Sequence, residues 1–167
     1  ILSGCGGSVS FIDTEKLPKI HSAYSITTQD IRTAAKAVLD SELHGKTGGI
    51  HIVALLDGAT VLTVSEDIGR HNALDRVIGY ALRNNADLSK TWVLVSGRIS
   101  SEMVRKCLIA GIPIIVSRGA TTTLAVETAE KTGLTVVGFA RSSKMVVYTH
   151  AQRVDGAGRD TAASKSK

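Results

Sequence analysis

Residues 64–75, VSEDIGRHNALD, concentrate side chains that can bind an anion or move a proton. Apolar segments flank this stretch on both sides, which predicts a strand before it and a helix after it. Gly69 permits a tight turn, and the first N–H groups of the helix are free to bind an anion. Two interpretations are open: Asp67 or Asn72 caps the helix while the other charges are solvated, or the stretch lines a binding site. The polar side chains concerned are Glu66, Asp67, Arg70, His71, Asn72 and Asp75.

A cysteine between glycines, Cys5 in the segment GCGGS, is the candidate for covalent chemistry. Glycines on both sides leave the thiol accessible and let the backbone of a partner approach closely. A thiolate on such a loop can accept a sulfane sulfur, hold it as a persulfide and pass it on. The alternative is a partly buried structural cysteine. Cys107 lies in an apolar helical stripe, so we expect it in the core.

Two later segments, VSGRISS and VSRGATT, repeat one arrangement of Ser, Gly and Arg between a strand and a helix. Ligands of open α/β sheets bind outside the carboxyl ends of the strands, so Arg70, Arg98 and Arg118 are expected on one rim. Arginine binds phosphate and carboxylate groups bidentately, and helix N-termini add backbone donors. The pattern therefore favours an anionic ligand, although it matches neither the GxGxxG nor the P-loop fingerprint. His51 begins a strand and joins the site only if other groups converge there.

The elements that would position these side chains form an α/β pattern. Helices are expected over residues 27–43, 70–84, 100–110 and 121–132, and a hairpin is expected to turn at Asp57-Gly58. The nearly all-apolar segments TWVLV, IPIIV and TVVGF alternate with helices, and MVVYTH follows as a last antiparallel strand. Such alternation predicts a mainly parallel sheet covered by helices on both faces.

Composition bounds the class of protein. The 167 residues are 43% hydrophobic and include no apolar run long enough for a membrane span. The net charge is +5, but only 4% of the residues are aromatic, which argues against a base-stacking nucleic-acid platform. Two cysteines and no visible signal peptide favour the cytoplasm. The first residue is not Met, so we expect a part of a longer protein, with one domain over residues 1–150 and a flexible basic tail over residues 151–167.

The blocks TGGIH, EDIGRHNALD, SGRISSEMVRK, AGIPIIVSRGATTTLAVE and GLTVVGFAR, followed by VVYTH, resemble the formate dehydrogenase accessory sulfurtransferases, the FdhD family. The resemblance runs in order from residue 47 to residue 150. It implies a three-layer α/β/α fold of the cytidine deaminase type, with a mixed, mainly parallel sheet. It also implies that the deaminase zinc is absent, and the chain lacks the HxE and PCxxC motifs that would bind it.

The resemblance further implies a cytoplasmic homodimer that takes sulfur from a cysteine desulfurase. The sulfur goes to the molybdenum bis(molybdopterin guanine dinucleotide) cofactor, which formate dehydrogenase requires. The family contacts this cofactor through the segment that corresponds here to Phe139, Ala140, Arg141, Ser142, Ser143 and Lys144. With the residues singled out above, the candidate pocket also includes His51, Arg70, His71, Asn72, Asp75, Ser96, Gly97, Arg98, Ser100, Arg118, Gly119 and Thr121.

One position departs from the family pattern. Family members commonly carry a CxxC pair where Cys5 lies, and the second cysteine would fall at Ser8. A sulfurtransferase in which Cys5 alone carries the persulfide is the first hypothesis. The alternative is a chaperone that binds the cofactor for formate dehydrogenase without a covalent step. No nucleic-acid or membrane partner is expected.

Overall fold

The computed structural model describes residues 13–39, 48–141 and 144–156 of the chain. Its centre is a six-stranded sheet with the order β3-β2-β4-β5-β6-β7. The strands are β2 (His51–Asp57), β3 (Thr60–Asp67), β4 (Trp92–Val95), β5 (Ile114–Ser117), β6 (Thr135–Gly138) and β7 (Val146–Thr149). A second sheet pairs β1 (Ile26–Thr27) with β8 (Val154–Asp155) in parallel.

The large sheet is mixed, as expected. Strands β4, β5 and β6 are parallel at its centre, whereas β2, β3 and β7 flank them in antiparallel pairs. Because β2 runs opposite to β4, His51 at its start lies at the same edge as the carboxyl ends of the central strands. The register pairs His51 with Asp67, so the end of β3 reaches this edge too. We call it the carboxyl edge.

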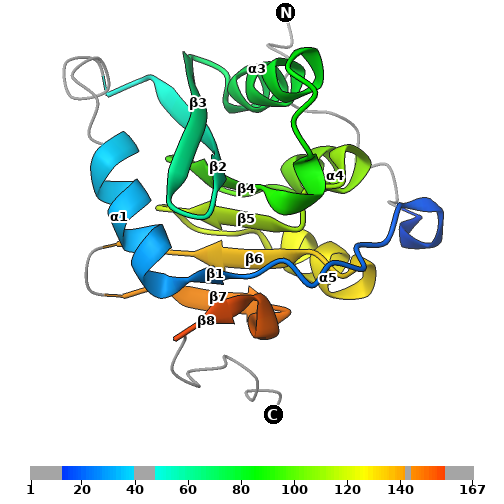
Figure 1. Ribbon diagram of the computed structural model, residues 1–167. Helices are drawn as coiled ribbons and strands as arrows, with labels where there is room; N and C mark the ends of the chain where they lie inside the picture. Colours follow the sequence, from blue (N-terminus) through cyan, green and yellow to red (C-terminus); the bar gives the residue numbers. More distant parts are fainter. Residues whose placement is uncertain (1–12, 40–47, 142–143, 157–167) are drawn as a thin grey trace, which may run out of the picture.

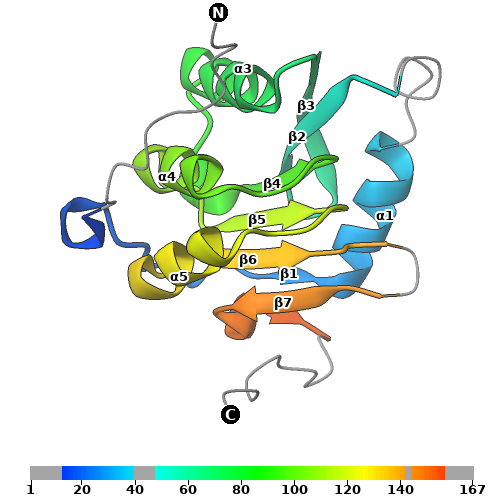
Figure 2. The same ribbon diagram turned by 180° about the vertical axis from the view of Figure 1, so that it is seen from behind.

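Helices cover both faces and complete the three layers (Figure 1 and Figure 2). On one face lie α3 (Arg70–Arg83), α4 (Ser101–Ala110) and α5 (Thr123–Thr132). On the other lies α1 (Thr28–Val38), together with β1 and β8. Short 3-10 helices are η1 (Thr14–Lys16), η2 (Leu88–Lys90) and η3 (Ala151–Arg153). The predicted three-layer α/β/α architecture is confirmed.

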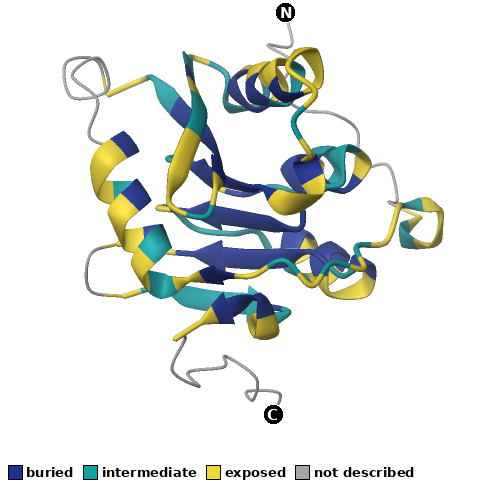
Figure 3. Cartoon of the chain, in the orientation of Figure 1, coloured by how far each residue is buried: buried dark blue, intermediate teal, exposed yellow. Residues whose placement is uncertain are grey.

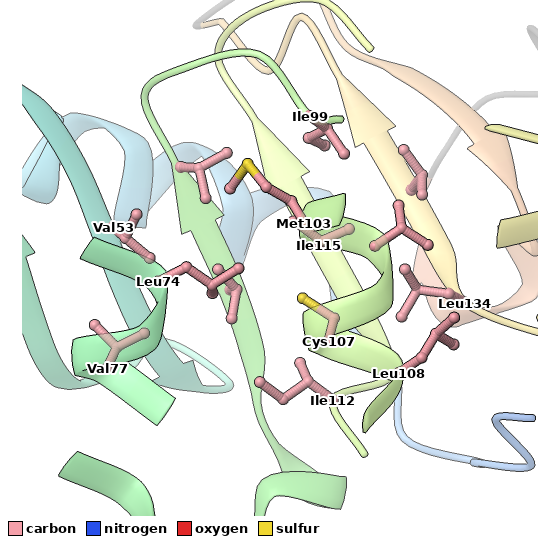
Figure 4. Packing of buried hydrophobic residues seen from close by; sticks show 14 of the residues in the cluster. Val53, Leu74, Val77, Ile99, Met103, Cys107, Leu108, Ile112, Ile115 and Leu134 are labelled. Carbon is pink, nitrogen blue, oxygen red and sulfur yellow. The ribbon is translucent and has the colours of Figure 1, made fainter. Parts of the chain in front are cut away.

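Each face of the sheet has its own apolar core, and the central strands are buried throughout (Figure 3). On the α3–α5 side, Leu74, Met103 and Leu108 pack on the sheet around Cys107 (Figure 4). Cys107 is fully buried, and burial raises the pKa of its thiol to about 12. The expectation that Cys107 belongs to the core is confirmed, and its thiol cannot readily become the thiolate that sulfur transfer requires.

Local sequence signals set the bounds of these elements. Thr27 and Asp30 form a capping box at the start of α1, and this helix ends near Leu39. The remainder of the expected helix, residues 40–43, lies outside the described residues. Gly58 has a φ of +52° in the β2–β3 turn, as the Asp-Gly dipeptide predicts. No helix among the described residues is long and apolar enough to cross a bilayer.

The fold continues past the boundary that composition predicts at residue 150. The Arg153 side chain is 5% exposed, and its guanidinium donates to the carbonyls of Ser22 (2.8 Å) and Gly133 (2.6 Å) and to Thr135 Oγ1 (3.1 Å). Val154 then enters β8. The boundary predicted at residue 150 is therefore too early, and residues 151–156 belong to the domain. The hydrogen bonds of the buried Arg153 guanidinium hold this segment in the fold despite its polar local composition. Residues 157–167 lie outside the described residues.

Candidate functional site

The carboxyl edge brings together three loops that are far apart in sequence. Ile99 donates to the carbonyl of Ala120 (3.0 Å), and Thr122 donates to the carbonyl of Ile99 (3.1 Å), which joins the β4–α4 and β5–α5 loops. The β6 end joins them, because Phe139 N–H donates to the carbonyl of Gly119 (2.9 Å). The segments that hold Arg98, Arg118 and Arg141 thus lie side by side, and all three side chains are exposed.

Two serines at this edge position the loops. Ser117 Oγ donates to the carbonyl of Gly97 (2.6 Å) and accepts from the N–H of Gly119 (2.8 Å). Ser96 Oγ accepts from the N–H of Ile52 (2.9 Å). Ser96 was expected to contact the ligand, yet its hydroxyl is used here to complete the sheet edge. Ser117, which the sequence analysis did not select, fixes the backbone of Gly97 and Gly119.

Glycine is required where the loops approach neighbouring groups. A Cβ on Gly97 would lie 2.7 Å from Nδ1 of His51, which is closer than real Cβ atoms come to other groups. A Cβ on Gly138 would lie 2.8 Å from Cε2 of Tyr148. The imidazole of His51 therefore lies directly against the β4–α4 loop. This contact places His51 beside Gly97, another candidate site residue, and its role in binding stays a prediction.

The segment expected to contact the cofactor begins with a backbone that non-glycine residues rarely adopt. Phe139 has a φ of +51° and is 39% exposed. Arg141 N–H then donates to the carbonyl of Lys144 (3.0 Å), which closes the turn between β6 and β7. Ala140 is only 2% exposed. Ser142 and Ser143 lie outside the described residues. Strained residues of this kind cluster at binding sites, where the surroundings maintain them.

The contacts at the start of α3 show whether Asp67 or Asn72 caps this helix. Gly69 is the N-cap residue, and it supplies no side-chain cap. Instead, Asp67 Oδ1 accepts from Gly69 N–H (2.8 Å) and from Asn72 Nδ2 (3.4 Å), while Asp67 Oδ2 pairs with Arg76 Nη2 (3.0 Å). The hydrogen bond from Gly69 is the main cause that lowers the pKa of Asp67. Asp67 and Asn72 therefore stabilise the turn.

His71 and Asp75 share one face of α3, and that face contacts α4. His71 Nε2 lies 3.4 Å from Glu102 Oε2, and Asp75 pairs with Lys106 Nζ at 2.5 Å. Burial lowers the pKa of His71, and the neighbouring Arg70 guanidinium lowers it further. Both effects favour the neutral form of the imidazole. Both residues were expected in the pocket, and the contacts that they make here join two helices.

Among the described residues, several buried polar side-chain atoms have no hydrogen-bond partner. Within the described part of the chain, such atoms are Arg70 Nε, Ser100 Oγ, Thr121 Oγ1 and Arg105 Nε. The first three belong to residues expected to bind the cofactor. Burying a polar group without a partner costs about 1–3 kcal/mol. The Arg70 and Arg105 Nε–H groups are donors and the two hydroxyls can donate or accept, so the oxygen atoms of an anionic ligand are partners of the right kind.

An open cleft of about 900 Å³ lies between α1 and the ends of β5 and β6. Four of its lining residues are basic: Arg32, Lys36, Arg118 and Arg141. Arg118 and Arg141 were expected at the site, whereas Arg32 and Lys36 were not. Arg32 and Lys36 are four residues apart in the sequence, and this spacing indicates that both lie on one face of the helix. The full lining is Gln29, Ile31, Arg32, Thr33, Ala35, Lys36, Ala37, Leu39, Arg118, Ala140 and Arg141.

Two parts of the expected chemistry are not tested by this geometry. Cys5 and Ser8 lie outside the described residues. Among residues 13–39, 48–141 and 144–156, no three His, Cys, Asp or Glu side chains lie close enough to hold a metal ion. The expectation that the chain binds no zinc stays a prediction.

The three layers and the mixed, mainly parallel sheet define an α/β fold of the cytidine deaminase type. A solved structure with this fold supports the class: the diaminohydroxyphosphoribosylaminopyrimidine deaminase/5-amino-6-(5-phosphoribosylamino)uracil reductase of Thermotoga maritima. It matches with a TM-score of 0.52 over 68% of this chain and 37% of that chain. Their sequence identity is 15%, so the likeness concerns the fold alone.

The match to a protein family is more specific than the likeness of fold. The model of the FdhD/NarQ family matches residues 1–155, and the chain belongs to this family. The resemblance drawn from the sequence blocks is thereby confirmed. A crystal structure of a formate dehydrogenase accessory protein from Desulfotalea psychrophila matches with a TM-score of 0.77 and 31% identity, over 84% of this chain and 61% of that chain.

Curated relatives carry the name sulfur carrier protein FdhD. The protein from Wolinella succinogenes is 49% identical over 70% of this chain and 41% of its own length. The protein from Geobacillus kaustophilus is 36% identical over 91% of this chain and 59% of its own length. The chain thus spans about half the length of the curated relatives that it matches.

Proposed function

We propose that this chain acts in sulfur transfer for the maturation of formate dehydrogenase. Cys5 would carry the sulfur, and the carboxyl edge would hold the molybdenum bis(molybdopterin guanine dinucleotide) that receives it. The names of the curated relatives support the sulfur carrier role. The name of the related crystal structure supports the link to formate dehydrogenase. A cysteine desulfurase as the sulfur donor, a homodimeric state and a cytoplasmic location belong to the same proposal.

The covalent step follows from thiol chemistry. The Cys5 thiolate would attack the terminal sulfur of a persulfide on the desulfurase. The bond between that sulfur and the desulfurase cysteine breaks, and the desulfurase cysteine leaves as a thiolate. Cys5 would then hold the persulfide, and delivery of its outer sulfur would break the S–S bond and release the Cys5 thiolate, with the acceptor supplying the electron pair for the new bond to sulfur. Cys107 cannot substitute for Cys5, because its buried thiol has a pKa raised to about 12.

The observation that carries the proposal is the set of unsatisfied groups at the carboxyl edge. Arg70 Nε, Ser100 Oγ and Thr121 Oγ1 are buried without partners. Ser100 and Thr121 belong to the two joined loops that also hold the exposed Arg98 and Arg118. The guanine dinucleotide ends of the cofactor offer phosphates, which arginine and helix N-termini bind well. A polyanion at this edge would offer oxygen acceptors to the unsatisfied polar groups and negative charge to the exposed arginines.

The first test is the Cys5→Ala variant in cells or extracts that depend on this protein for formate dehydrogenase. The proposal predicts a loss of at least about a hundredfold in dehydrogenase activation, because only a thiolate attacks a persulfide. Binding of the cofactor to the variant should persist. The Ser8→Ala variant is the control and should retain activation. Full activation by Cys5→Ala would exclude the carrier role.

A second candidate function is a chaperone that binds the cofactor and transfers no sulfur. The observation in its favour is Ser8, which stands where the family commonly has a second cysteine. This function predicts that Cys5→Ala is silent while Arg70→Ala weakens cofactor binding and activation. The sulfur carrier predicts that both variants fail, the first in transfer and the second in binding.

A further inference from the structure

Residues 20–27, which we call the strap, connect the two faces of the large sheet. The strap includes β1 and runs between η1 and α1 (Figure 1). Ile20 packs against the apolar core beneath α3, α4 and α5, whereas Ile26 is buried in the core of the opposite face. Between them, Tyr24 Oη accepts from the N–H of Gly58 (2.8 Å), in the turn that follows β2. The strap therefore passes around the sheet at the edge opposite to the carboxyl edge.

The start of the strap lies directly against the end of α5. Ile20 N–H donates to the carbonyl of Thr132 (2.8 Å), the last residue of this helix. Gly133, the C-cap residue, has a φ of +83°, and a Cβ added there would overlap the carbonyl oxygen of Ile20. A larger residue at position 133 would therefore push the strap away from the helix.

The buried Arg153 side chain joins the strap to α5 and β6. Its Nε donates to the carbonyl of Ser22 in the strap (2.8 Å). Its Nη1 donates to the carbonyl of Gly133 (2.6 Å) and to Oγ1 of Thr135, the first residue of β6 (3.1 Å). The carbonyl end of a helix attracts a cation, and the rigid fork of donors in a guanidinium can bond several segments at once. One side chain thus holds three segments together.

These three segments lead to the two parts of the proposed chemistry. Cys5 lies eight residues before Asp13, where the described part of the chain begins, so the chain keeps it within about 29 Å of that point. Thr135 begins β6, which leads into Phe139, the first residue of the segment expected to contact the cofactor. The hydrogen bonds of Arg153 therefore connect the part of the chain that leads to the sulfur carrier with the part that leads to the cofactor.

We propose that Arg153 is a positioning residue, which holds the strap against α5 and β6 and thereby sets where the sulfur on Cys5 can reach. This inference rests on the proposed function, in which Cys5 delivers sulfur to a cofactor at the carboxyl edge. Acceptance of sulfur from a desulfurase needs only an accessible thiolate, whereas delivery needs Cys5 to meet the bound cofactor. Loss of the Arg153 hydrogen bonds therefore slows delivery and leaves acceptance unchanged.

The first test replaces Arg153 with methionine, which keeps an unbranched side chain but donates no hydrogen bond. Hydrogen exchange of the strap amides should become at least about tenfold faster, because local opening of the strap becomes easier. Delivery of sulfur from the loaded chain should slow at least about tenfold, while acceptance from a desulfurase should change less than about twofold. Arg83→Met is the control, because Arg83 is exposed in the last turn of α3, and it should change none of these measurements.

A pair of glycine variants tests the strap without removing the guanidinium. Gly111 and Gly133 end α4 and α5 with φ of +77° and +83°, so alanine is strained to a similar extent at both positions. A Cβ would meet nothing within 4 Å at Gly111, whereas at Gly133 it would overlap the strap. Gly133→Ala should therefore reproduce the faster exchange and slower delivery of Arg153→Met. Gly111→Ala should keep the ratio of delivery to acceptance of the unmodified chain.

The outcomes separate this inference from the proposed function. Faster strap exchange with unchanged delivery would overturn the positioning role, while the sulfur carrier function would stand. Equal losses of acceptance and delivery would show general destabilisation and would overturn it too, as would unchanged strap exchange in Arg153→Met. The glycine pair decides the matter if Arg153→Met does not fold. An unmodified chain that accepts no sulfur would overturn the proposed function and the positioning role together.

Discussion

At the scale of single residues, the carboxyl edge depends on close contacts that only small side chains allow. The ring of His51 lies against Gly97, and the Ser117 hydroxyl links Gly97 in the β4–α4 loop to Gly119 in the β5–α5 loop. The Phe139 backbone is held in a left-handed conformation beside the same loops. The edge is therefore a rigid, preformed surface.

Replacing Gly97 with alanine tests this preformed geometry. The added Cβ would lie 2.7 Å from His51 Nδ1, so the imidazole or the loop must move. We expect the free energy of unfolding to fall by about 1–3 kcal/mol, as for other overpacking substitutions. Urea denaturation measures this change.

Gly79→Ala provides the control within the same chain. Gly79 lies inside α3, and a Cβ there would meet nothing within 4 Å. Alanine should raise the free energy of unfolding by about 0.5–1 kcal/mol, since glycine weakens a helix interior. If Gly97→Ala were as well tolerated as Gly79→Ala, the contact between His51 and the loop would not constrain the site.

At the scale of elements, α3 and α4 are joined by pairs of charged side chains with the same spacing on both helices. His71 faces Glu102, and one turn further Asp75 faces Lys106. The sequence predicts that His71 and Asp75 share a face, because four residues make about one helical turn. It does not reveal which element that face meets, since Glu102 and Lys106 lie about 30 residues away and reach it only in the fold.

The His71 contact predicts a pH dependence. Burial and the Arg70 charge lower the pKa of His71, while Glu102 and Asp75 raise it and Lys106 lowers it. The unfolded chain therefore binds a proton more readily than the folded one. Stability due to this residue is present above the ordinary imidazole pKa of about 6.5 and is lost as the pH falls below it.

The measurement compares the free energy of unfolding of the unmodified chain and of His71→Gln between about pH 7.5 and pH 5.5, where an imidazole titrates. The unmodified chain should lose more stability over this range than His71→Gln. Glu102→Gln should steepen the loss, because the attraction that favours the protonated imidazole is removed. Parallel pH curves for the unmodified chain and His71→Gln would contradict the account.

At the scale of the whole molecule, periodicity and turn residues suffice to predict a mainly parallel, helix-covered sheet, and the family resemblance implies its three layers. Buried strands read as continuous apolar runs, and Gly111 and Gly133 end α4 and α5 in left-handed conformations. The role of α1 as a wall of the cleft could not be predicted, because Arg32 and Lys36 look like solvated helix charges until the cleft is known. Arg153 likewise appears in a polar segment, and only the fold supplies its buried acceptors.

The central claim is that Cys5 carries sulfur, and mass spectrometry tests it most directly. The full chain is incubated with a cysteine desulfurase and cysteine, and its peptides are then weighed without reduction. We expect a gain of one sulfur mass, roughly 32 Da, on the peptide that contains Cys5, because a thiolate accepts sulfane sulfur by exchange. The peptide that contains the buried Cys107 should keep its mass and serves as the internal control. No gain on Cys5 in the presence of an active desulfurase would contradict the account.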